Sequence, residues 1–224
     1  MLELKEVAKS YGKNEVLSSI NFKVEQGKII GLVGENGAGK STLLNIIATL
    51  NKPSRGTISY NNLNYHKNIK KIRKKIGYVP QEIAVWEHLS VRENMLFFEQ
   101  LSWKRQSEED LRKLCTEMNL TKWTEKVSTL SGGMKRKLNL AISLIHEPEL
   151  LLLDEPTVGI DLRSKKEIAT YLKELVIDKQ LIMIYISHDM DEIKQLCDKI
   201  YSLGDDSYYE ALLKNEGLFV VNLS

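Results

Sequence analysis

The chain has 224 residues, of which 42% are hydrophobic, and its 32 basic and 30 acidic residues leave a formal net charge of +2. This length can bury a full core without disulfides, and the balanced charge excludes a protein that binds nucleic acid through a general basic field. No run of about 18 apolar residues could span a membrane, residues 1–5 show no secretory leader, and Cys115 and Cys197 match neither a disulfide framework nor a zinc motif. We therefore expect one compact, soluble, intracellular unit in which both cysteines are buried apolar side chains.

Three short segments near the N-terminus are predicted to be strands. Residues 2–7 and 20–24 alternate apolar and polar side chains, and residues 28–33 form a short apolar run. Alternation is typical of a half-buried strand, whereas the apolar run fits a strand buried on both faces. A helical spacing of apolar side chains follows, at Leu43, Leu44, Ile46, Ile47 and Leu50. A strand, a glycine-rich turn and a helix in this order begin a βαβ unit.

The middle of the chain, residues 82–129, is predicted to be helical and poor in strands. Ser90 with Glu93 forms a capping box, and Ser107 with Asp110 forms a second one with Asp in place of Glu. The apolar stripe of the second helix consists of Leu111, Leu114, Cys115 and Met118. We interpret this region as a helical lobe inserted into an α/β domain.

The last third returns to an α/β pattern. Residues 138–145 are apolar on nearly all sides, which predicts a buried helix, and residues 150–153 and 181–186 are predicted core strands. Helical sequence lies between these strands, with Ile168, Tyr171, Leu172 and Leu175 on one face. Strands separated by helices favour parallel pairing.

Residues 34–41, Gly-Glu-Asn-Gly-Ala-Gly-Lys-Ser, match the phosphate-binding pattern G-x-x-x-x-G-K-[ST] in full. The motif follows a predicted strand and precedes a predicted helix. Glycines let the backbone N–H groups turn inward, and the helix N-terminus adds a partial positive charge. Lys40 can reach the terminal phosphates, and the Ser41 hydroxyl can ligate Mg²⁺. An ordinary glycine-rich turn would not combine these features, so a nucleotide phosphate site is predicted.

Two carboxylates, Asp154 and Glu155, directly follow the predicted strand 150–153. Ligands of open parallel sheets bind beyond the carboxyl ends of the strands, so Asp154 is expected at the same rim as the phosphate loop. There it can hold magnesium, and Glu155 can polarise an attacking water. Alone, such a pair is typical of a solvated strand end. Beside the phosphate loop, we interpret it as a metal ligand and a base.

A third motif, Leu130-Ser131-Gly132-Gly133-Met134, precedes a helix that Ser131 would cap. The phosphate loop, this motif, the Asp154-Glu155 pair and His188 of Ile-Ser-His-Asp follow one another in the order and context of one family. From about residue 2 to 203, the chain resembles the ATP-binding subunit of an ABC transporter.

The resemblance implies an α/β fold: a P-loop NTPase core with a mixed, mainly parallel sheet, an N-terminal antiparallel β part and an inserted helical subdomain. It implies a single ABC ATPase domain over residues 1–224. Its ATP-binding core would comprise 1–81 and 130–204, and its helical lobe 82–129. The C-terminal tail, 205–224, has no assignment.

The resemblance also implies roles for single residues. Tyr11 would stack on adenine, Gln81 would sense Mg²⁺ and link the core to the lobe, and His188 would contact the γ-phosphate. Taken alone, Tyr11 is more typical of a surface turn and His188 of a strand end. The implied catalytic set is Glu155, His188, Lys40 and Gln81, and the implied metal set is Ser41, Gln81 and Asp154. The implied ATP-binding set is Tyr11, Gly34, Glu35, Asn36, Gly37, Ala38, Gly39, Lys40, Ser41 and Thr42.

A second copy of the chain is implied as well. Ser131, Gly132 and Gly133 would contact ATP held by another subunit, and the loop that ends at Asp161 would cross the dimer interface. The helix 131–145 covers about 21 Å at about 1.5 Å per residue, so Ser131 is expected far from its own chain's ATP. Two chains packed head to tail would close each signature over the partner's nucleotide.

The sequence departs from the family pattern at three places. Met134 stands where the family usually has Gln, and Leu162 follows Asp161 where Pro is frequent. After Leu203 the usual strand-and-glycine ending is not recognisable. The sequence therefore does not predict the structure after Leu203, but none of the three departures changes the expected chemistry.

Three surface features allow two interpretations each. Residues 67–75 are rich in Lys and Arg, and Ile69, Ile72 and Ile76 predict an amphipathic helix whose basic face is either solvated or close to a membrane. Residues 135–137, Lys-Arg-Lys, form either a solvated basic face or an electropositive rim near the partner's ATP. Trp86 is either a core side chain or an exposed anchor for a membrane subunit.

The sequence favours a motor ATPase that binds ATP and Mg²⁺, dimerises with itself or a similar subunit, and powers a separate membrane permease. The resemblance places it at the cytoplasmic face of the membrane, with no nucleic acid partner, and is strongest to the exporters of drugs, peptides, lipids or polysaccharides. The alternative is a soluble ABC ATPase that acts on ribosomes, DNA or assembly partners. A binding module without turnover is disfavoured because Lys40, Asp154 and Glu155 are all present.

Overall fold

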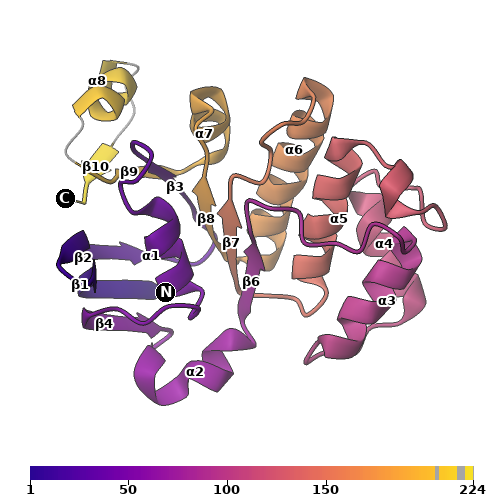
Figure 1. Ribbon diagram of the computed structural model, residues 1–224, viewed down its shortest axis with the longest axis horizontal. Helices are drawn as coiled ribbons and strands as arrows, with labels where there is room; N and C mark the ends of the chain where they lie inside the picture. The colour runs from indigo at the N-terminus through magenta and orange to yellow at the C-terminus, as the bar shows by residue number, and fades with distance from the viewer. Residues whose placement is uncertain (205–206, 216–219, 224) are drawn as a thin grey trace.

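The computed structural model describes residues 1–204, 207–215 and 220–223, which form two β-sheets with helices packed against them (Figure 1). No helix in these described ranges is long and apolar enough to cross a membrane. The fold class expected from the sequence is confirmed: an α/β fold with an N-terminal antiparallel sheet, a parallel sheet and a helical insert.

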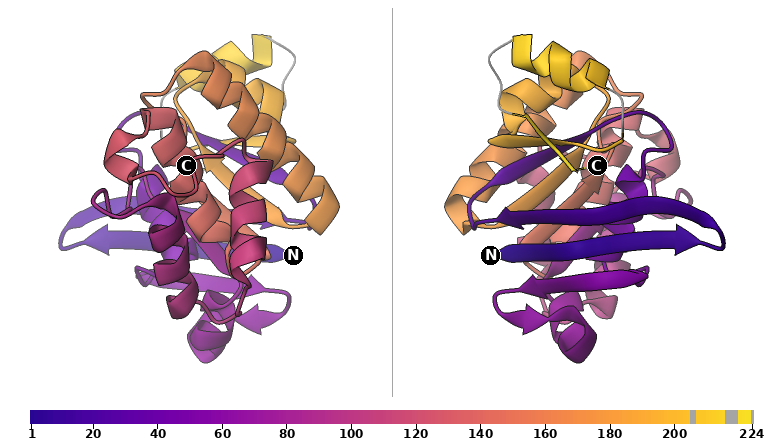
Figure 2. Two further views of the ribbon diagram at one scale, coloured as in Figure 1. Left: turned by 90° about the vertical axis from the view of Figure 1, so that its right-hand side faces the viewer. Right: turned by 90° about the vertical axis from the view of Figure 1, so that its left-hand side faces the viewer.

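A four-stranded antiparallel sheet, in the order β2-β1-β4-β5, forms the N-terminal part of the molecule (Figure 2, right). Its strands are β1 (Leu2–Tyr11), β2 (Asn14–Val24), β4 (Arg55–Tyr60) and β5 (Leu63–Asn64). The predicted strands 2–7 and 20–24 lie inside β1 and β2. Their buried side chains include Leu4, Val7 and Ile20, so the alternation in sequence marks one covered face.

A six-stranded parallel sheet, in the order β10-β9-β3-β8-β7-β6, forms the centre of the molecule. Its strands are β3 (Ile29–Val33), β6 (Ile76–Val79), β7 (Leu150–Asp154), β8 (Ile182–Ile186), β9 (Lys199–Ser202) and β10 (Val220–Asn222). Strands β3, β7 and β8 are buried along their whole length, which explains their apolar sequences. Because the strands are parallel, their carboxyl ends lie at one edge.

Successive residues of the central strands face two cores on opposite sides of the sheet. On β7, Leu151 and Leu153 pack in one core with the helices of the C-terminal two thirds, whereas Leu150 and Leu152 pack in the other core. That second core also holds α1 (Lys40–Ile47) and the antiparallel sheet (Figure 1). Leu50, expected on the apolar face of this helix, lies beyond its end and is exposed.

The helical insert consists of α3 (Val91–Leu101), α4 (Glu108–Glu117) and a short 3₁₀ turn, η1 (Val127–Thr129). Both predicted capping boxes are confirmed: Ser90 with Glu93 begins α3, and Ser107 with Asp110 begins α4. The insert packs beside α5 (Gly132–Leu144), which is buried as expected (Figure 2, left). Burial raises the pKa of Cys115 on α4 to about 12, as expected of an apolar thiol.

Two more helices complete the C-terminal half, α6 (Leu162–Lys179) and α7 (Met190–Leu196). Ile168 and Leu172 of α6 are buried, and Tyr171 and Leu175 pack against the same core, so the predicted stripe is confirmed. Cys197, just after α7, is only partly exposed and packs against this core.

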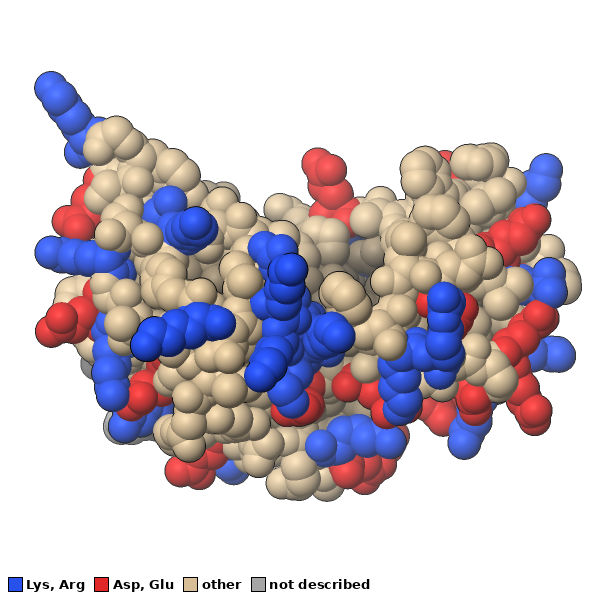
Figure 3. Space-filling view, turned by 90° about the horizontal axis from the view of Figure 1, so that it is seen from below, with Lys and Arg blue, Asp and Glu red and all other residues tan. Residues whose placement is uncertain are grey.

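The basic segment 67–75 is not one amphipathic helix. Helix α2 (Tyr65–Arg73) ends before Ile76, which instead begins β6, and its backbone is kinked at Asn68. Ile76 therefore fits the spacing by coincidence, because the sheet and not the helix buries it. Lys67, Lys70, Lys71 and Lys74 are exposed, which favours a basic surface, and Figure 3 shows lysine and arginine side chains gathered in the middle of the face seen from below.

The C-terminal tail, which the sequence left unassigned, adds α8 (Ser207–Asn215) and β10. Val220 pairs with Ile200 of β9, so the tail lengthens the parallel sheet by one strand. Residues 205–206, 216–219 and 224 lie outside the described part of the chain.

Candidate functional site

Four loops meet at the carboxyl edge of the parallel sheet. The glycine-rich loop follows β3, Gln81 follows β6, Glu155 follows β7 and His188 follows β8. They enclose a hollow of about 250 Å³ lined by Asn36, Gly37, Gly39, Lys40, Ser41, Thr42, Gln81, Glu155 and His188. The sheet thus brings together residues that lie more than a hundred positions apart in the sequence.

The glycine-rich loop requires glycine where it passes the rest of the fold. Gly34 has φ 142°, and a Cβ there would lie 2.3 Å from the Leu203 carbonyl oxygen. Gly39, with φ 94°, is the N-cap of α1 and offers no side chain to its first turn. The N–H groups of that turn are therefore available to an anion in the hollow, where the positive end of the helix dipole lies.

Lys40 supplies the cation of the hollow. It is buried, and its Nζ donates hydrogen bonds to the carbonyl oxygens of Gly34, at 2.7 Å, and Glu35, at 2.8 Å. Burial lowers the pKa of Lys40, and the nearby carboxylates of Glu155 and Asp154 oppose that shift. The Lys40 ammonium is thus held beside the glycine-rich loop, where a phosphate would bind.

Asp154, the last residue of β7, is a carboxylate only 5% exposed. Burial raises its pKa, and a hydrogen bond from Ser41 opposes the shift. Its Oδ1 has no hydrogen-bond partner among the described residues. An unpartnered carboxylate oxygen beside a serine hydroxyl fits a hard, oxygen-seeking cation such as Mg²⁺.

The described residues hold no group of three or more His, Cys, Asp or Glu side chains that could enclose a metal ion. Mg²⁺ commonly needs no such cage, because one or two carboxylates hold it together with phosphate and water oxygens. Asp154 is a carboxylate of that kind, and Ser41 and Gln81 carry further side-chain oxygens near it.

Glu155 projects into the hollow from a strained backbone position with φ 48°. Its N–H donates to the Ile186 carbonyl, which ties the turn to β8. Its two carboxylate oxygens lie 3.1 Å from His188 Nε2 and 3.1 Å from Gln81 Nε2. The structure therefore brings the three side chains into direct contact, and a water beside Glu155 would meet an oriented base.

Tyr11 lies apart from these groups. It ends β1, is 49% exposed, and its hydroxyl accepts a hydrogen bond from Asn51 Nδ2 at 3.3 Å. Lys9 Nζ lies 4.8 Å from its ring centroid. Tyr11 does not line the hollow, so its exposed ring lies outside the phosphate site.

The motif 130–134 forms a second polar helix start, away from the hollow. Ser131 caps α5 by accepting a hydrogen bond from the Met134 N–H at 3.3 Å. A Cβ on Gly133 would lie 2.4 Å from Ser164 Oγ, whereas one on Gly132 would meet nothing closer than 3.8 Å. Asp161 in turn accepts hydrogen bonds from the Ser164 N–H and hydroxyl, and caps α6. The signature and the loop before α6 are thus packed together within one chain.

The basic segment 135–137 is not a solvated face, because Arg136 and Lys137 are buried and the partly exposed Lys135 pairs with Glu87. Arg136 is buried, and its guanidinium donates to the carbonyl oxygens of Gln81 and, at 3.5 Å, Val158. Lys137 is buried against Glu167. Arg136 therefore joins α5 to two loops of the site, a role that the sequence analysis missed. The position of Arg136 in the sequence did not indicate these contacts, because only the folded chain brings the two carbonyl groups close to its guanidinium.

Trp86 is 48% exposed, so the interpretation as a core side chain is wrong. Its ring meets Phe97 edge-on, with centroids 6.2 Å apart. This leaves an aromatic surface on the insert beside the loop that follows Gln81.

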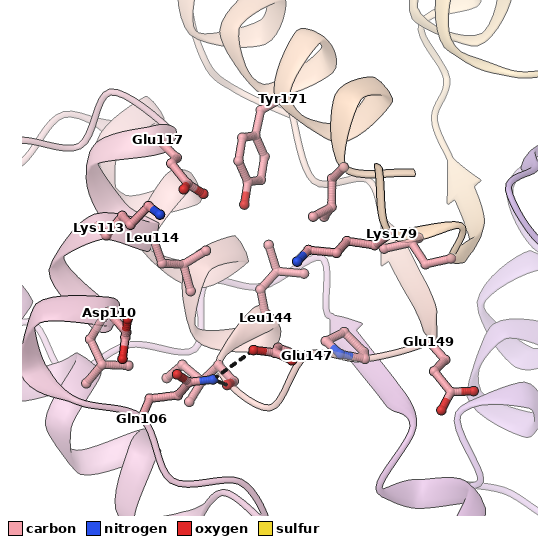
Figure 4. A pocket seen from close by; sticks show the side chains of 15 residues that line it. Gln106, Asp110, Lys113, Leu114, Glu117, Leu144, Glu147, Glu149, Tyr171 and Lys179 are labelled. Atoms are coloured by element: carbon pink, nitrogen blue, oxygen red, sulfur yellow. Dashed lines mark hydrogen bonds between the residues drawn. The ribbon is translucent and has the colours of Figure 1, made fainter. Parts of the chain in front are cut away.

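A second hollow, of about 310 Å³, lies between α4, α5 and α6 (Figure 4). Its wall includes residues 147–149, which precede β7, so it lies at the amino end of that strand. Three of its acids have partners: Asp110 accepts from Ser107, Glu149 pairs with Lys75, and Glu147 pairs with Lys104 and accepts from Gln106, which also lines the hollow.

Comparison with known sequences decides the family. The family described as "ABC transporter" matches residues 17–158, which include the glycine-rich loop, the signature and both carboxylates. The chain belongs to the ABC transporter family. The chain spans between 13% and 65% of the length of eight curated relatives that it matches.

Two relatives and one solved structure illustrate the match. The cassette is 39% identical over 203 residues to the linearmycin resistance ATP-binding protein LnrL of Bacillus subtilis, covering 89% of this chain and 65% of that protein. It is 36% identical over 202 residues to the Nod factor export ATP-binding protein I of Rhizobium etli, covering 89% and 64%. The dimeric structure of MJ0796, a bacterial ABC transporter cassette, matches with a TM-score of 0.81 and 26% identity, covering 91% and 94%. Import ATP-binding proteins are similar as well.

Proposed function

We propose that the cassette binds Mg-ATP at the carboxyl edge of the parallel sheet and hydrolyses it. The observation that carries this proposal is the contact of Glu155 with both Gln81 and His188, in the same hollow as the glycine-rich loop and Lys40. An anion cradle beside a fixed carboxylate is the arrangement that phosphoryl transfer to water requires.

Each residue at this edge of the sheet has a proposed role that fits its chemistry. The N–H groups at the start of α1 and the Lys40 ammonium bind the phosphates. Ser41, Gln81 and Asp154 would hold Mg²⁺, which would supply positive charge beside the phosphate oxygens. Glu155 orients and polarises the attacking water, and His188 contacts the γ-phosphate. Tyr11, exposed outside the hollow, offers its ring to the adenine.

The same proposal includes partners. The core (1–81 and 130–204) would pair with a second cassette, so that Ser131, Gly132 and Gly133 meet the partner's ATP. The similarity to a structure described as dimeric supports this arrangement. The helical lobe (82–129) would dock on a separate permease at the cytoplasmic face of the membrane, with exposed Trp86 as one contact. Export is the favoured direction, because the relatives described above include an export ATP-binding protein.

Phosphate release tests the enzyme activity. The purified chain should release phosphate from ATP when Mg²⁺ is present, stop when a chelator removes the metal, and lose at least 90% of the activity with Lys40→Ala. Lys71→Ala, which removes an exposed lysine of α2, is the matched control and should retain full activity. Full activity of Lys40→Ala would contradict the assignment of the phosphate site.

Light scattering tests the pairing. A Glu155→Gln variant should bind ATP without consuming it, and should shift from monomer to dimer when Mg-ATP is added. If that variant binds ATP and stays monomeric at all protein concentrations, the shared site at Ser131 is wrong. Co-purification with an integral membrane protein would separate the transport proposal from a soluble ABC ATPase.

A further inference from the structure

A buried hydrogen-bond network joins the two loops that carry Glu155 and His188. Its centre is the Glu192 carboxylate on α7, whose Oε2 accepts hydrogen bonds from three hydroxyl groups. These are Thr157 Oγ1 at 2.7 Å, Tyr185 Oη at 2.9 Å and Ser187 Oγ at 2.9 Å. All three donor residues are buried and the Glu192 side chain is 10% exposed, so little water competes for these bonds.

The other carboxylate oxygen of Glu192 faces a cation on α6. Lys165 Nζ lies 3.2 Å from Glu192 Oε1 and 2.8 Å from Asp189 Oδ2. The Oε1 contact lacks hydrogen-bond geometry, so it contributes charge attraction and not a directed bond. Asp189 also caps α7, accepting hydrogen bonds from two N–H groups of its first turn. The network therefore ties the start of α7 to α6 as well as to both loops.

The partners of Glu192 lie within two residues of groups in the hollow. Thr157 comes two residues after Glu155, and Ser187 directly precedes His188. His188 Nε2 and Glu155 Oε1 are 3.1 Å apart, so a shift of either loop would change the contact between them. Glu192 itself does not line the hollow.

We propose that Glu192 is a positioning residue for ATP hydrolysis, which fixes the loops at Thr157 and Ser187 so that His188 stays against Glu155. This inference rests on the proposed hydrolysis. Because Glu192 contacts the loops and not the cavity, it acts on turnover and leaves nucleotide affinity unchanged. Small displacements of catalytic groups are costly, because the reacting geometry tolerates little error.

The first test compares Glu192→Gln with the wild-type chain. The amide keeps the size of the side chain and one oxygen for the three hydroxyls, but it places an NH₂ group against Lys165. The kcat for phosphate release should fall at least tenfold, with the KM for Mg-ATP within twofold. Asp191→Asn, an exposed change on the same helix, is the matched control and should leave kcat within twofold. An unchanged kcat in a folded Glu192→Gln variant overturns the inference.

Thr157→Val keeps the inference testable if Glu192→Gln does not fold. It removes one donor and leaves the charge pair with Lys165 in place. The expected loss of kcat is threefold to tenfold at an unchanged KM. Wild-type kcat in this variant also overturns the inference.

A double-variant cycle separates positioning from general damage to the fold. His188→Ala alone should lower kcat. In that background, Glu192→Gln should lower kcat by less than a further twofold, because the side chain that it positions is gone. Losses that multiply would show that Glu192 acts by another route and overturn the inference. A wild-type chain without Mg²⁺-dependent phosphate release would overturn the proposed function, whereas wild-type turnover with unaffected variants overturns this inference alone.

Discussion

Two helix N-termini of the molecule have glycine at or next to the N-cap and could each meet a phosphate, yet they differ in what surrounds them. Helix α1 begins at Lys40, after Gly39, which offers no side-chain cap, and its start lies in one hollow with Glu155 and Gln81. Helix α5 begins at Gly132, and the hydroxyl of its N-cap, Ser131, already accepts a hydrogen bond from the first turn. The first helix start is equipped for binding and chemistry, and the second lies outside the hollow.

The comparison shows that the glycines at the two helix starts have different structural roles. At α5, Gly133 serves the chain's own packing against Ser164, whereas Gly132 leaves an open face. At α1, Gly34 allows the close approach to the Leu203 carbonyl, and Gly39 leaves the first-turn N–H groups without a side-chain cap. A helix N-terminus alone is therefore not a catalytic site. The start of α1 differs from that of α5 because Asp154 and Glu155, at the carboxyl end of β7, and the loops after β6 and β8 lie beside it.

The change with the largest expected effect removes the base from the α1 side. Glu155→Gln should lower phosphate release by about 10²–10⁴-fold, because a positioned general base is worth that much in rate. Nucleotide affinity should be preserved, since the glycine-rich loop and Lys40 are untouched. Steady-state phosphate release and a binding titration on the same preparation measure both quantities. Turnover at the wild-type rate would mean that Glu155 is not the base.

On the α5 side, the two signature glycines should respond differently to alanine. Gly133→Ala should lower the free energy of unfolding by about 1–3 kcal/mol, because its Cβ would overlap Ser164. Gly132→Ala should leave stability unchanged, since its Cβ meets only ordinary contacts. Denaturant unfolding measures both. Adding Ser164→Gly to Gly133→Ala should restore part of the loss, and equal effects of the two alanines would contradict the packing difference.

A smaller effect is expected at Tyr11, which extends the α1 side beyond the phosphates. Tyr11→Ala should weaken ATP binding about tenfold, because stacking of a base on an aromatic ring is worth about 1–3 kcal/mol. Inorganic triphosphate, which has no base, should bind both forms equally. Lys9→Ala, which removes the cation over the ring, serves as the control and should change ATP affinity by less than threefold. ATP affinity equal to wild type in Tyr11→Ala would show that the ring makes no contact with adenine.

The smallest expected effect is on stability at Asp154. Burial raises the pKa of this carboxyl, so the folded state binds its proton more tightly than the unfolded state. The charged carboxylate therefore destabilises the metal-free protein above that raised pKa, and the penalty disappears as the pH falls below the unfolded value. Asp154→Asn should raise stability at pH 7 without Mg²⁺ by about 1 kcal/mol, or about 2–4 °C in melting temperature.

Melting curves at pH 7 and near pH 4 check this prediction, since the gain should shrink at the lower pH. Asp178→Asn, an exposed change on α6, is the control and should show no gain. A lower melting temperature for Asp154→Asn at pH 7 would contradict the account of a buried carboxylate with one oxygen that accepts no hydrogen bond.

Local signals made much of the fold predictable. Ser90 and Ser107 cap their helices through partners three residues away, so both helix starts could be found from sequence. The glycine-rich loop could also be found from sequence, because residues 34–41 form one contiguous motif. Ile76 misled the helix prediction, because a residue at helical spacing can belong to the strand that follows.

The remaining site residues depend on contacts between distant segments. Arg136 donates to carbonyls 55 and 22 positions away, and Glu192 accepts from Thr157, 35 positions away. No periodicity or motif in the sequence encodes such pairings. The burial of Lys137 has the same origin, because Glu167 of another helix neutralises it.

The most direct test of the central claim is a calorimetric titration of Mg-ATP into Glu155→Gln and into Glu155→Gln combined with Lys40→Ala. The account expects binding to the first variant that requires the metal, and an affinity at least tenfold weaker in the second. Equal affinities in the two variants would show that the triphosphate does not lie in the glycine-rich loop.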